Sequence, residues 1–330
     1  MRPFDYVRAA GVRDAVAQVV GRPDAVFLAG GTNLVDHIKL GIAGPGLLVD
    51  ITGLPLDTVE PLPDGGARIG ALVRNSDLAA EPVIRQRYPM LSQALLAGAS
   101  GQLRNMATTG GNLLQRTCCP YFQDLSTPCN KRQPGSDCSA VEGYHRDHAI
   151  LGASAHCVAV NPSDMAVALC ALGAVAQVHG PGGERSIPVE TLYRLPGDEP
   201  QRDTVLEHGE LITAVHLPAL PMAARSRYRK VRDRTSYAFV LVSVAVAAQI
   251  EAGAVRDMRI AFGGLAPRPW RARAASRCCA ARPRPGKMAA RAAGAELAAA
   301  RPLAGNVFKA SLARGALAAV IRELTRQATP

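Results

Sequence analysis

Long apolar segments are scarce in this sequence, and none is long enough to cross a membrane. The longest, Ala238–Ile250, has 13 residues and includes Ser243 and Gln249, whereas a transmembrane helix needs roughly 20 apolar residues. The N-terminus lacks an apolar stretch behind a basic start, so we expect no secretory signal there. We therefore expect Ala238–Ile250 to be a buried strand or a pair of strands.

Aromatic residues are also scarce, at 4% of the 330 residues, with one tryptophan. Proteins that bind single-stranded nucleic acids use aromatic side chains as stacking platforms, so this composition counts against that class.

The formal net charge is nevertheless +11, and residues 268–330 carry all of it, with 13 Lys and Arg against 2 acidic residues. A basic segment of this kind can meet a nucleic acid, a membrane surface or an acidic partner protein. With 48% hydrophobic residues the chain can bury a core, and its length suits two domains or one large one.

The eight cysteines include no C-x-x-C pair, the usual signature of a zinc site. Without a secretory signal they point to metal or redox chemistry rather than to a disulfide framework. Their long, irregular spacings suit a loop folded around an iron–sulfur cluster, with zinc as the alternative, and free thiols in a polar loop would oxidise readily. His145 and His148 are candidate ligands, although we expect solvated loop histidines, and Lys131 and Arg132 would offset thiolate charge. Five cysteines lie within 40 residues: Cys118, Cys119, Cys129, Cys138 and Cys157.

The glycine turns lack the G-x-G-x-x-G dinucleotide fingerprint. Two turns instead pair glycines with Thr and Asn: Leu28–Leu34 (LAGGTNL) and Ala107–Leu113 (ATTGGNL). Adjacent glycines allow a ligand to approach the backbone closely, and N–H groups at the start of the next helix can cradle a pyrophosphate. Each turn alone is weak evidence, because any tight strand-to-helix turn can use Gly-Gly. Together, about 80 residues apart, they could clamp one extended phosphate-bearing ligand.

Apolar patterning predicts regular structure on both sides of an irregular cysteine-bearing window at residues 116–156. Regular structure is expected to resume at Cys157–Val160, and Ser163 is expected to cap a helix over Asp164–Leu172. A boundary is expected near Pro218–Ala224, and Arg268–Pro285 should be the least structured part of the C-terminal half. Expected strands lie at residues 25–29, 47–51, 67–73, 174–178, 185–189, 211–217, 227–231, 239–250 and 255–262, and expected helices begin at residue 34, span 76–84 and 90–97, and fill much of the Ala-rich last 60 residues.

Several segments carry a resemblance to a known family: AGGTNLVDHIKLG, ATTGGNLLQRTCCPYF, CNKRQPGSDC, HAILGASAHCVAVNPSD and FGGLAPRPW. The chain resembles the FAD-binding medium subunit of the xanthine oxidase family of molybdenum hydroxylases over essentially its whole length. The resemblance implies an α+β fold. Residues 1–222 would form a vanillyl-alcohol-oxidase (PCMH)-type FAD-binding domain of two lobes, with an iron–sulfur insertion at about 116–160. Residues 223–330 would form an α+β domain like the C-terminal domain of the carbon monoxide dehydrogenase flavoprotein.

The resemblance also implies which residues contact FAD. Asp164 matches an acid that holds a hydroxyl of FAD, and Lys230 matches a lysine near the flavin. Thr213, or its neighbour Ile212, should lie against the flavin. The first pyrophosphate loop would be Val26, Phe27, Leu28, Ala29, Gly30, Gly31, Thr32, Asn33 and Leu34, and the second would be Thr108, Gly110, Gly111 and Asn112.

The cysteine-bearing segment is similar to one branch of this family, the bacterial periplasmic aldehyde oxidoreductases, whose flavin subunit carries a four-iron cluster. The ligands implied are Cys119, Cys129, Cys138 and Cys157. Cys118 departs from the pattern, because a basic residue is expected there. Adjacent residues of an extended loop point to opposite sides, so only one of Cys118 and Cys119 should bind iron, and we predict Cys119. We also predict a mainly structural cluster, because its ligands lie between two FAD-binding segments.

By this resemblance, the chain is a flavin subunit that carries FAD and a [4Fe-4S] cluster and does not oxidise the substrate itself. Electrons would come from a small [2Fe-2S] subunit and a large molybdenum-cofactor subunit and go to an external acceptor. The basic C-terminal segment would meet an acidic partner face or solvent, with no nucleic acid and no membrane span involved. The location would be periplasmic by co-export with a partner subunit, or cytoplasmic. The alternatives are a zinc-stapled basic nucleic-acid-binding protein and a free-standing flavin reductase or oxidase.

Overall fold

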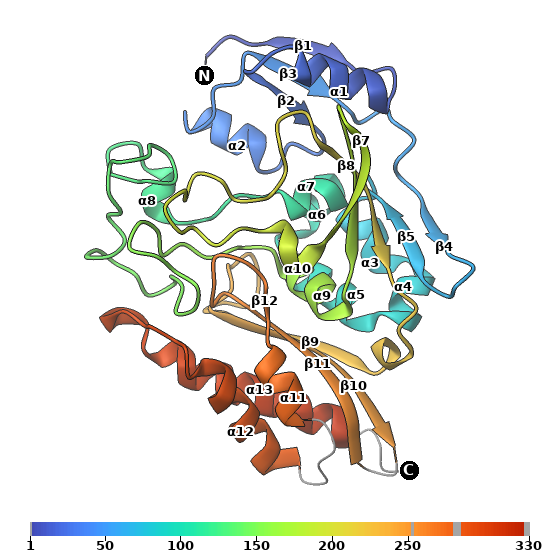
Figure 1. The fold of residues 1–330 in the computed structure, drawn as a ribbon, viewed down its shortest axis with the longest axis vertical. Coiled ribbons are helices and arrows are strands. Elements are labelled where there is room, and N and C mark those ends of the chain that lie inside the picture. The colour runs from blue at the N-terminus through green and yellow to red at the C-terminus, as the bar shows by residue number, and fades with distance from the viewer. Residues whose placement is uncertain (1, 252–253, 280–284, 327–330) are drawn as a thin grey trace.

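In the computed structural model, which describes residues 2–251, 254–279 and 285–326, the N-terminal lobe is built on a parallel sheet in the order β1-β3-β2 (Figure 1). Parallel neighbours need crossover connections, and helices α1 and α2 supply them. The inner face of α1 buries Ala15, Val16 and Val19. The elements of this lobe are β1 Asp5–Arg8, α1 Val12–Val20, β2 Ala25–Leu28, α2 Leu34–Lys39 and β3 Leu47–Asp50.

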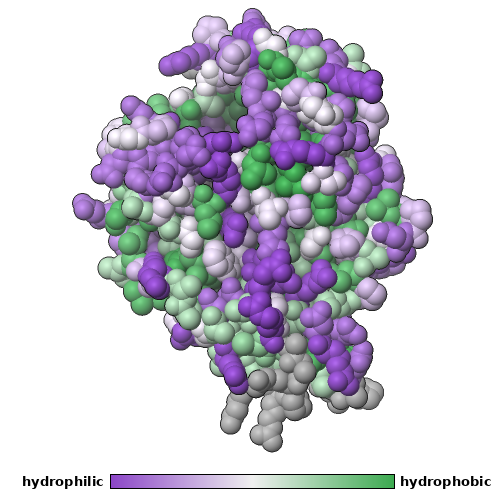
Figure 2. All heavy atoms as spheres, viewed as in Figure 1, coloured by the Kyte–Doolittle hydropathy of each residue, from purple (hydrophilic) through white to green (hydrophobic). Residues whose placement is uncertain are grey.

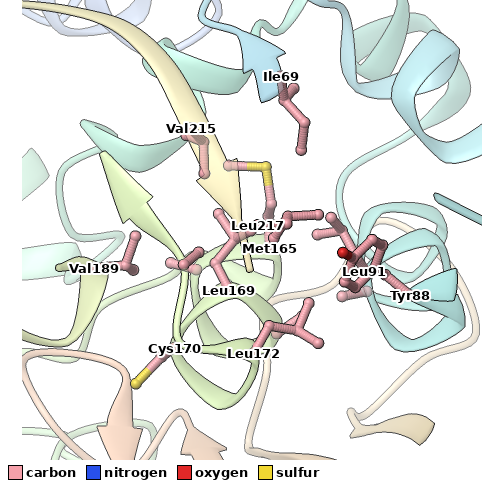
Figure 3. Close-up of a cluster of buried hydrophobic side chains, with 14 of the residues drawn as sticks. Ile69, Tyr88, Leu91, Met165, Leu169, Cys170, Leu172, Val189, Val215 and Leu217 are labelled. Carbon is pink, nitrogen blue, oxygen red and sulfur yellow. The ribbon is translucent and has the colours of Figure 1, made fainter. Parts of the chain in front are cut away.

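A five-stranded antiparallel sheet, in the order β4-β5-β8-β6-β7, forms the second lobe. Helix α9 is buried along its whole length, with Met165, Leu169 and Leu172 in the core (Figure 3). Ser163 caps α9 as predicted, since its side chain accepts a hydrogen bond from the Ala166 N–H. The elements are β4 Val59–Pro61, β5 Ala67–Gly70, α3 Asn75–Ala80, α4 Pro82–Arg87, α5 Pro89–Ala97, α6 Gly101–Met106, α7 Thr109–Leu113, α9 Asp164–Leu172, β6 Val175–Gly180, β7 Gly183–Pro188, α10 Val189–Leu192 and β8 Leu211–Leu217.

The helix predicted over residues 76–84 is in fact two helices, α3 and α4, separated at Glu81. Proline donates no backbone hydrogen bond and disfavours the helical conformation in the residue before it, and Pro82 begins α4 directly after Glu81 at ψ 123°. The first of these helices also begins one residue earlier than predicted, at Asn75, with Arg74 as its N-cap.

Between α7 and α9 lies a long irregular segment whose residues 116–160 we call the cysteine loop. Its one helix within the described residues is the short α8 Pro120–Gln123, and its backbone pairs through isolated bridges at Cys129↔Cys138 and Ser154↔Cys157. The prediction of an irregular window is therefore confirmed. Regular structure does not resume at Cys157–Val160, where the prediction was wrong. Cys157 packs instead into a small core of the loop itself, with Phe122 and Ala140.

The C-terminal unit is an antiparallel sheet in the order β12-β11-β10-β9, with helices on one face (Figure 1). Strand β10 is buried on both faces: Val244 and Val246 pack toward the helices and Ala245 packs into the second lobe. No helix of the described ranges is long and apolar enough to cross a membrane. The elements are η1 Pro221–Ala224, β9 Ser226–Val231, β10 Val242–Glu251, β11 Ala254–Gly263, β12 Trp270–Arg271, α11 Arg273–Cys279, α12 Pro285–Leu297, η2 Ala304–Asn306 and α13 Phe308–Arg326.

The stretch Arg268–Pro285 is more ordered than the sequence led us to expect. It contains β12 and α11, because Ala275 and Cys279, spaced four residues apart, are both buried in the core of the C-terminal unit. The remainder of that prediction, at residues 280–284, lies outside the described residues.

Candidate functional site

The first glycine turn follows β2 at the carboxyl end of the small parallel sheet. Gly31 has φ +71°, a conformation that L side chains rarely adopt. Within the described residues, the amide N–H groups of Gly31, Thr32 and Asn33 donate no hydrogen bond to the protein. Residues 26–35 are all half-buried, in contrast to the buried β3 beside them. Free amides on a partly open turn are suited to binding an anion.

The second glycine turn is built differently, because its amides bond within the protein. Thr108 caps α7 by accepting a hydrogen bond from the Gly111 N–H at 3.3 Å. The Gly110 N–H donates to the Ala71 carbonyl at 2.8 Å. Gly111 is exposed and Asn112 half-buried. This turn therefore offers a surface without side chains rather than free N–H donors.

The two turns lie against each other. A Cβ added to Gly30 would stand 1.9 Å from the Met106 carbonyl oxygen, at the end of α6. The Asn33 side chain accepts a hydrogen bond from the Arg116 backbone N–H at 3.0 Å. Segments about 80 residues apart in the sequence thus form one site. In the space-filling view, apolar side chains gather between the N-terminal lobe and the level of α7 (Figure 2).

Asp164 and Lys230, both predicted to lie at the FAD site, form a buried ion pair with each other. The Lys230 Nζ lies 2.8 Å from an Asp164 carboxylate oxygen, and the two side chains are 4% and 7% exposed. Tyr228 donates a hydrogen bond to the same carboxylate at 2.5 Å. Burial and the Asp164 charge raise the pKa of Tyr228 well above its usual value. The sequence reasoning missed Tyr228, although its place two residues before Lys230 on β9 puts both side chains on one face.

Asp164 is also tied to the second glycine turn through its neighbour. The Ser163 hydroxyl donates a hydrogen bond to the Asn112 side-chain oxygen at 2.6 Å. This contact joins the two ends of the cysteine loop, since Asn112 lies just before it and Ser163 just after.

Thr213 lies on β8, beside Ala71, the residue after β5 whose carbonyl accepts the hydrogen bond from the second turn. Its carbonyl accepts a hydrogen bond from the Ala71 N–H at 3.0 Å, and its hydroxyl donates to the Gln177 carbonyl at 3.3 Å. Thr213 is half-buried, whereas its neighbour Ile212 is buried. Of these two residues, Thr213 is the better placed to meet a ligand.

The four predicted cysteine ligands line one small cavity, which is partly open to solvent. Cys118 does not line this cavity. In the part of the chain that the structure describes, no three His, Cys, Asp or Glu side chains converge closely enough to hold a single metal ion. Four thiols around one cavity are a donor set that can hold either an iron–sulfur cluster or a zinc ion. The lining cysteines are Cys119, Cys129, Cys138 and Cys157.

Burial favours the neutral form of two of these thiols, those of Cys119 and Cys157. Burial raises the pKa of Cys119 to about 12 and also raises that of Cys157. Thiolates are the metal-binding form, so bound cations would have to supply the compensating charge. The outer surface around α8 is mainly hydrophilic (Figure 2), while Cys119, Cys129 and Cys157 are buried.

His148 is not the solvated loop histidine that we expected. It is buried, its Nε2 lies 3.1 Å from the Cys119 sulfur, and burial lowers its pKa to about 4. His145 is half-buried, and its Nε2 accepts a hydrogen bond from the Gly305 N–H at 2.8 Å. His148 therefore lies beside the thiols, as its place among the candidate ligands suggested, but it is buried rather than solvated.

The basic neighbours of the thiols have partners of their own. The Lys131 Nζ lies 2.5 Å from an Asp203 oxygen, and Arg132 donates hydrogen bonds to the Tyr121 and Phe122 carbonyls. Besides any charge that they offset, Lys131 ties the loop to the connection that carries Asp203, and Arg132 joins parts of the loop to each other.

One residue of the basic C-terminal segment meets neither a partner face nor solvent, the two surroundings expected for this segment, but contacts the cysteine loop. The buried Lys309 Nζ donates hydrogen bonds to the carbonyls of Asp147 and His148 at 2.9 Å and of Gly264 at 2.5 Å. Burial lowers the pKa of Lys309 to about 8. Lys309 therefore ties the cysteine loop to α13.

Comparison with known proteins assigns both parts of the chain. Residues 2–220 match the family described as FAD binding domain in molybdopterin dehydrogenase, and residues 226–324 match the CO dehydrogenase flavoprotein C-terminal domain. The chain is 50% identical to the aldehyde oxidoreductase FAD-binding subunit PaoB of Escherichia coli (strain K12), over 99% of this chain and 100% of that protein. It is 27% identical to the glyceraldehyde dehydrogenase medium chain of Sulfolobus acidocaldarius, over 82% of this chain and 78% of that one.

Solved structures share the fold over nearly the whole chain. A chain of the carbon monoxide dehydrogenase from Hydrogenophaga pseudoflava superposes with a TM-score of 0.77 at 25% identity, covering 99% of both chains. A chain of quinoline 2-oxidoreductase from Pseudomonas putida 86 gives 0.76 at 22% identity, with 98% of both chains covered. The predicted α+β fold, with a domain of this C-terminal type, is confirmed.

Proposed function

The chain belongs to the FAD-binding subunits of the molybdenum hydroxylases, and from that membership we propose that it is the electron-transferring flavin subunit of an aldehyde oxidoreductase. The full-length similarity to an aldehyde oxidoreductase subunit at 50% identity supports this assignment. Bound FAD would supply the chemistry of accepting and releasing electrons. The chain's own residues bind and orient that cofactor, and the substrate is oxidised elsewhere.

The contact between the two glycine turns is the observation that carries the proposal. We propose that the free amides of Gly31, Thr32 and Asn33 hold the FAD pyrophosphate, while Gly110 and Gly111 let it approach the second turn. Thr213 would lie against the flavin. Asp164 would accept a hydrogen bond from an FAD hydroxyl while Lys230 balances its charge, since each carboxylate oxygen has more than one lone pair.

We further propose that Cys119, Cys129, Cys138 and Cys157 hold a [4Fe-4S] cluster in the cysteine cavity. Their convergence on one cavity, with Cys118 outside its lining, supports this ligand set. The role would be mainly structural. The Asn112–Ser163 hydrogen bond joins the two ends of the cysteine loop. A cluster that fixes the loop would therefore also hold the second glycine turn against Asp164.

The partners in this proposal are a small [2Fe-2S] subunit, a large molybdenum-cofactor subunit and an external electron acceptor. The names of the relatives support a multi-subunit setting, since several are called subunits or medium chains. The alternative of a zinc-stapled nucleic-acid-binding protein finds no support in the family match, which assigns both halves of the chain to flavin-subunit domains.

The test is to purify the assembled complex, measure its flavin and iron content, and subtract the iron that belongs to the partner subunits. We expect one FAD and about four iron atoms beyond those of the partner subunits. Cys129→Ser should lose the iron of this chain and, under a structural role, part of its FAD. Cys278→Ser is the matched control, because Cys278 lies on α11 outside the cavity lining. Full FAD occupancy, intact folding and lost electron transfer in Cys129→Ser would contradict the structural role, and a colourless zinc protein would contradict the whole proposal.

A further inference from the structure

We propose that Arg116, Asp203 and Lys131 form a charge network that makes FAD binding and the order of the cysteine loop depend on each other. These are positioning residues, and nothing requires them to touch FAD or iron. The inference rests on the proposed function in one respect, that FAD binds at the first glycine turn. It extends that function by naming the physical link between the FAD site and the cysteine loop.

The network joins three segments that are distant in sequence. The Asp203 carboxylate lies 2.7 Å from the Arg116 Nε through one oxygen and 2.5 Å from the Lys131 Nζ through the other. Lys131 also donates a hydrogen bond to the Pro200 carbonyl at 2.6 Å. Arg116 lies three residues after the end of the second glycine turn at Leu113. Lys131 lies between Cys129 and Cys138, and Asp203 belongs to the connection from α10 to β8. In Figure 1 that connection runs beside the part of the chain that carries α8.

At one end, the network reaches the first glycine turn through a single hydrogen bond. The backbone N–H of Arg116 donates to the Asn33 side chain at 3.0 Å. The guanidinium of the same residue also lies over the Phe122 ring of α8, 4.7 Å from its centroid. The contacts of the Arg116 side chain with Asp203 and Phe122 therefore fix the position of its backbone. They fix with it the hydrogen bond from that backbone to Asn33.

At the other end, Lys131 enters the wall of the cysteine cavity. Its side chain is 7% exposed, and it lines the cavity together with Cys129 and Cys138. A buried ammonium group needs a partner, and here the partner is Asp203. Any loosening of the loop around Cys129 would withdraw Lys131 from Asp203, and any movement of Asp203 would leave the ammonium without its carboxylate.

The network contains two cations and one carboxylate, so Asp203 is its central member. Burial alone would raise the pKa of Asp203, but the Lys131 and Arg116 charges outweigh burial and lower it. Two cations thus share one carboxylate. Removing that carboxylate leaves the cations facing each other, whereas removing either cation still leaves one ion pair. Asp203 is accordingly the position where one substitution uncouples both ends.

Because the link is a chain of equilibrium contacts, the coupling has to be reciprocal. FAD that fixes the first turn would fix Arg116 and, through Asp203 and Lys131, slow the opening of the cysteine loop. A loop that is ordered around Cys129 would in turn raise the affinity for FAD. Coupling of this kind between two sites is typically about 5- to 150-fold in affinity.

The decisive variant is Asp203→Asn in the assembled complex, with Asp198→Asn as the matched control. Asp198 lies in the same connection, but its side chain is 97% exposed, and its one ion-pair contact among the described residues is with the exposed His156 ring at 3.5 Å. Two quantities are measured: the FAD dissociation constant after flavin removal and readdition, and backbone hydrogen exchange across residues 125–140 with and without FAD. We expect Asp203→Asn to weaken FAD binding by about tenfold and to abolish the FAD-dependent protection of the loop. Asp198→Asn should behave as the wild type in both.

Lys131→Met provides a second variant that removes the ammonium and keeps the aliphatic side chain. It should also reduce the protection, so the test stands even if Asp203→Asn fails to assemble. If Asp203→Asn and Lys131→Met match the control in affinity and exchange, the inference is wrong. Wild-type protein that binds FAD without any exchange change in the loop would overturn the coupling and leave the proposed cofactor binding intact. Wild-type protein that binds no FAD would overturn both.

Discussion

Gly30→Ala tests whether the contact between the two glycine turns is needed for cofactor binding. The added methyl group would stand 1.9 Å from the Met106 carbonyl oxygen, 2.8 Å from its carbonyl carbon and 3.2 Å from the Ala107 Cα. All three are backbone atoms, so no side chain can rotate to relieve the overlap. The turn must therefore withdraw from α6, or α6 must move.

The size of the effect follows from that overlap. A carbon and a carbonyl oxygen in close contact stay about 3.3 Å apart, so the segments must separate by roughly 1.4 Å. Inserting a methyl group into a packed position costs about 1–3 kcal/mol. If bound FAD needs both turns in their present places, that cost appears in the binding equilibrium. The expected loss of affinity is then between roughly fivefold and 150-fold.

The assay is a titration of the flavin-depleted complex with FAD, followed by flavin fluorescence, for wild type, Gly30→Ala and Gly101→Ala. Gly101 is the matched control because it lies at the start of α6 and an added Cβ meets nothing within 4 Å. Thermal unfolding of each variant separates local loss of binding from global unfolding. If Gly30→Ala bound FAD as tightly as Gly101→Ala, the two turns would not form one site.

Three further predictions concern the buried polar contacts. Lys230→Met should lower the free energy of unfolding by about 3–5 kcal/mol, measured by urea denaturation, because it leaves the Asp164 carboxylate buried without its ammonium partner; an unchanged midpoint would contradict the buried pair. Ser163→Ala should lower the free energy of unfolding by about 1 kcal/mol through the lost cap of α9, and further through the lost hydrogen bond to Asn112. The ends of the cysteine loop should then be cleaved faster by protease, and an unchanged cleavage rate would show that this hydrogen bond does not hold them together. The lowered pKa of Asp203 in the folded state means that its contribution to stability is complete above about pH 4 and is lost as the pH falls through that folded pKa. The stability difference between wild type and Asp203→Asn should therefore shrink from pH 5 to pH 3, and a constant difference would show that the Asp203 charge is not involved.

Much of the secondary structure was accessible from the sequence, because local chemistry determines it. Ser163 before an apolar stretch predicted α9 with its correct cap, and the strands expected at residues 174–178 and 185–189 correspond to β6 and β7, which pair with each other. Errors arose where tertiary packing decides. Cys157–Val160 has the composition of a strand but packs into the core of the cysteine loop. The segment from Arg268 is basic and rich in proline, yet Ala275 and Cys279 give it a buried helical face.

The candidate site shows the same division. Glycine turns, cysteine spacing and the resemblance of the motifs were enough to name Gly30, Asp164 and Lys230 as candidates. The sequence did not show which charged side chains pair with each other, because ion pairs form between segments that only the fold brings together. Asp164 and Lys230 bind each other, and Tyr228, with no signal of its own, completes the group.

The sequence by itself determined the family, the fold class and the residue types of the site, because turns, caps and short motifs are properties of neighbouring residues. Only the tertiary structure decided that the first turn keeps its amides free while the second uses them internally. It also decided that four cysteines surround one cavity and that Lys131 faces Asp203. These features depend on where distant segments meet, and burial then fixes which polar group each one must satisfy.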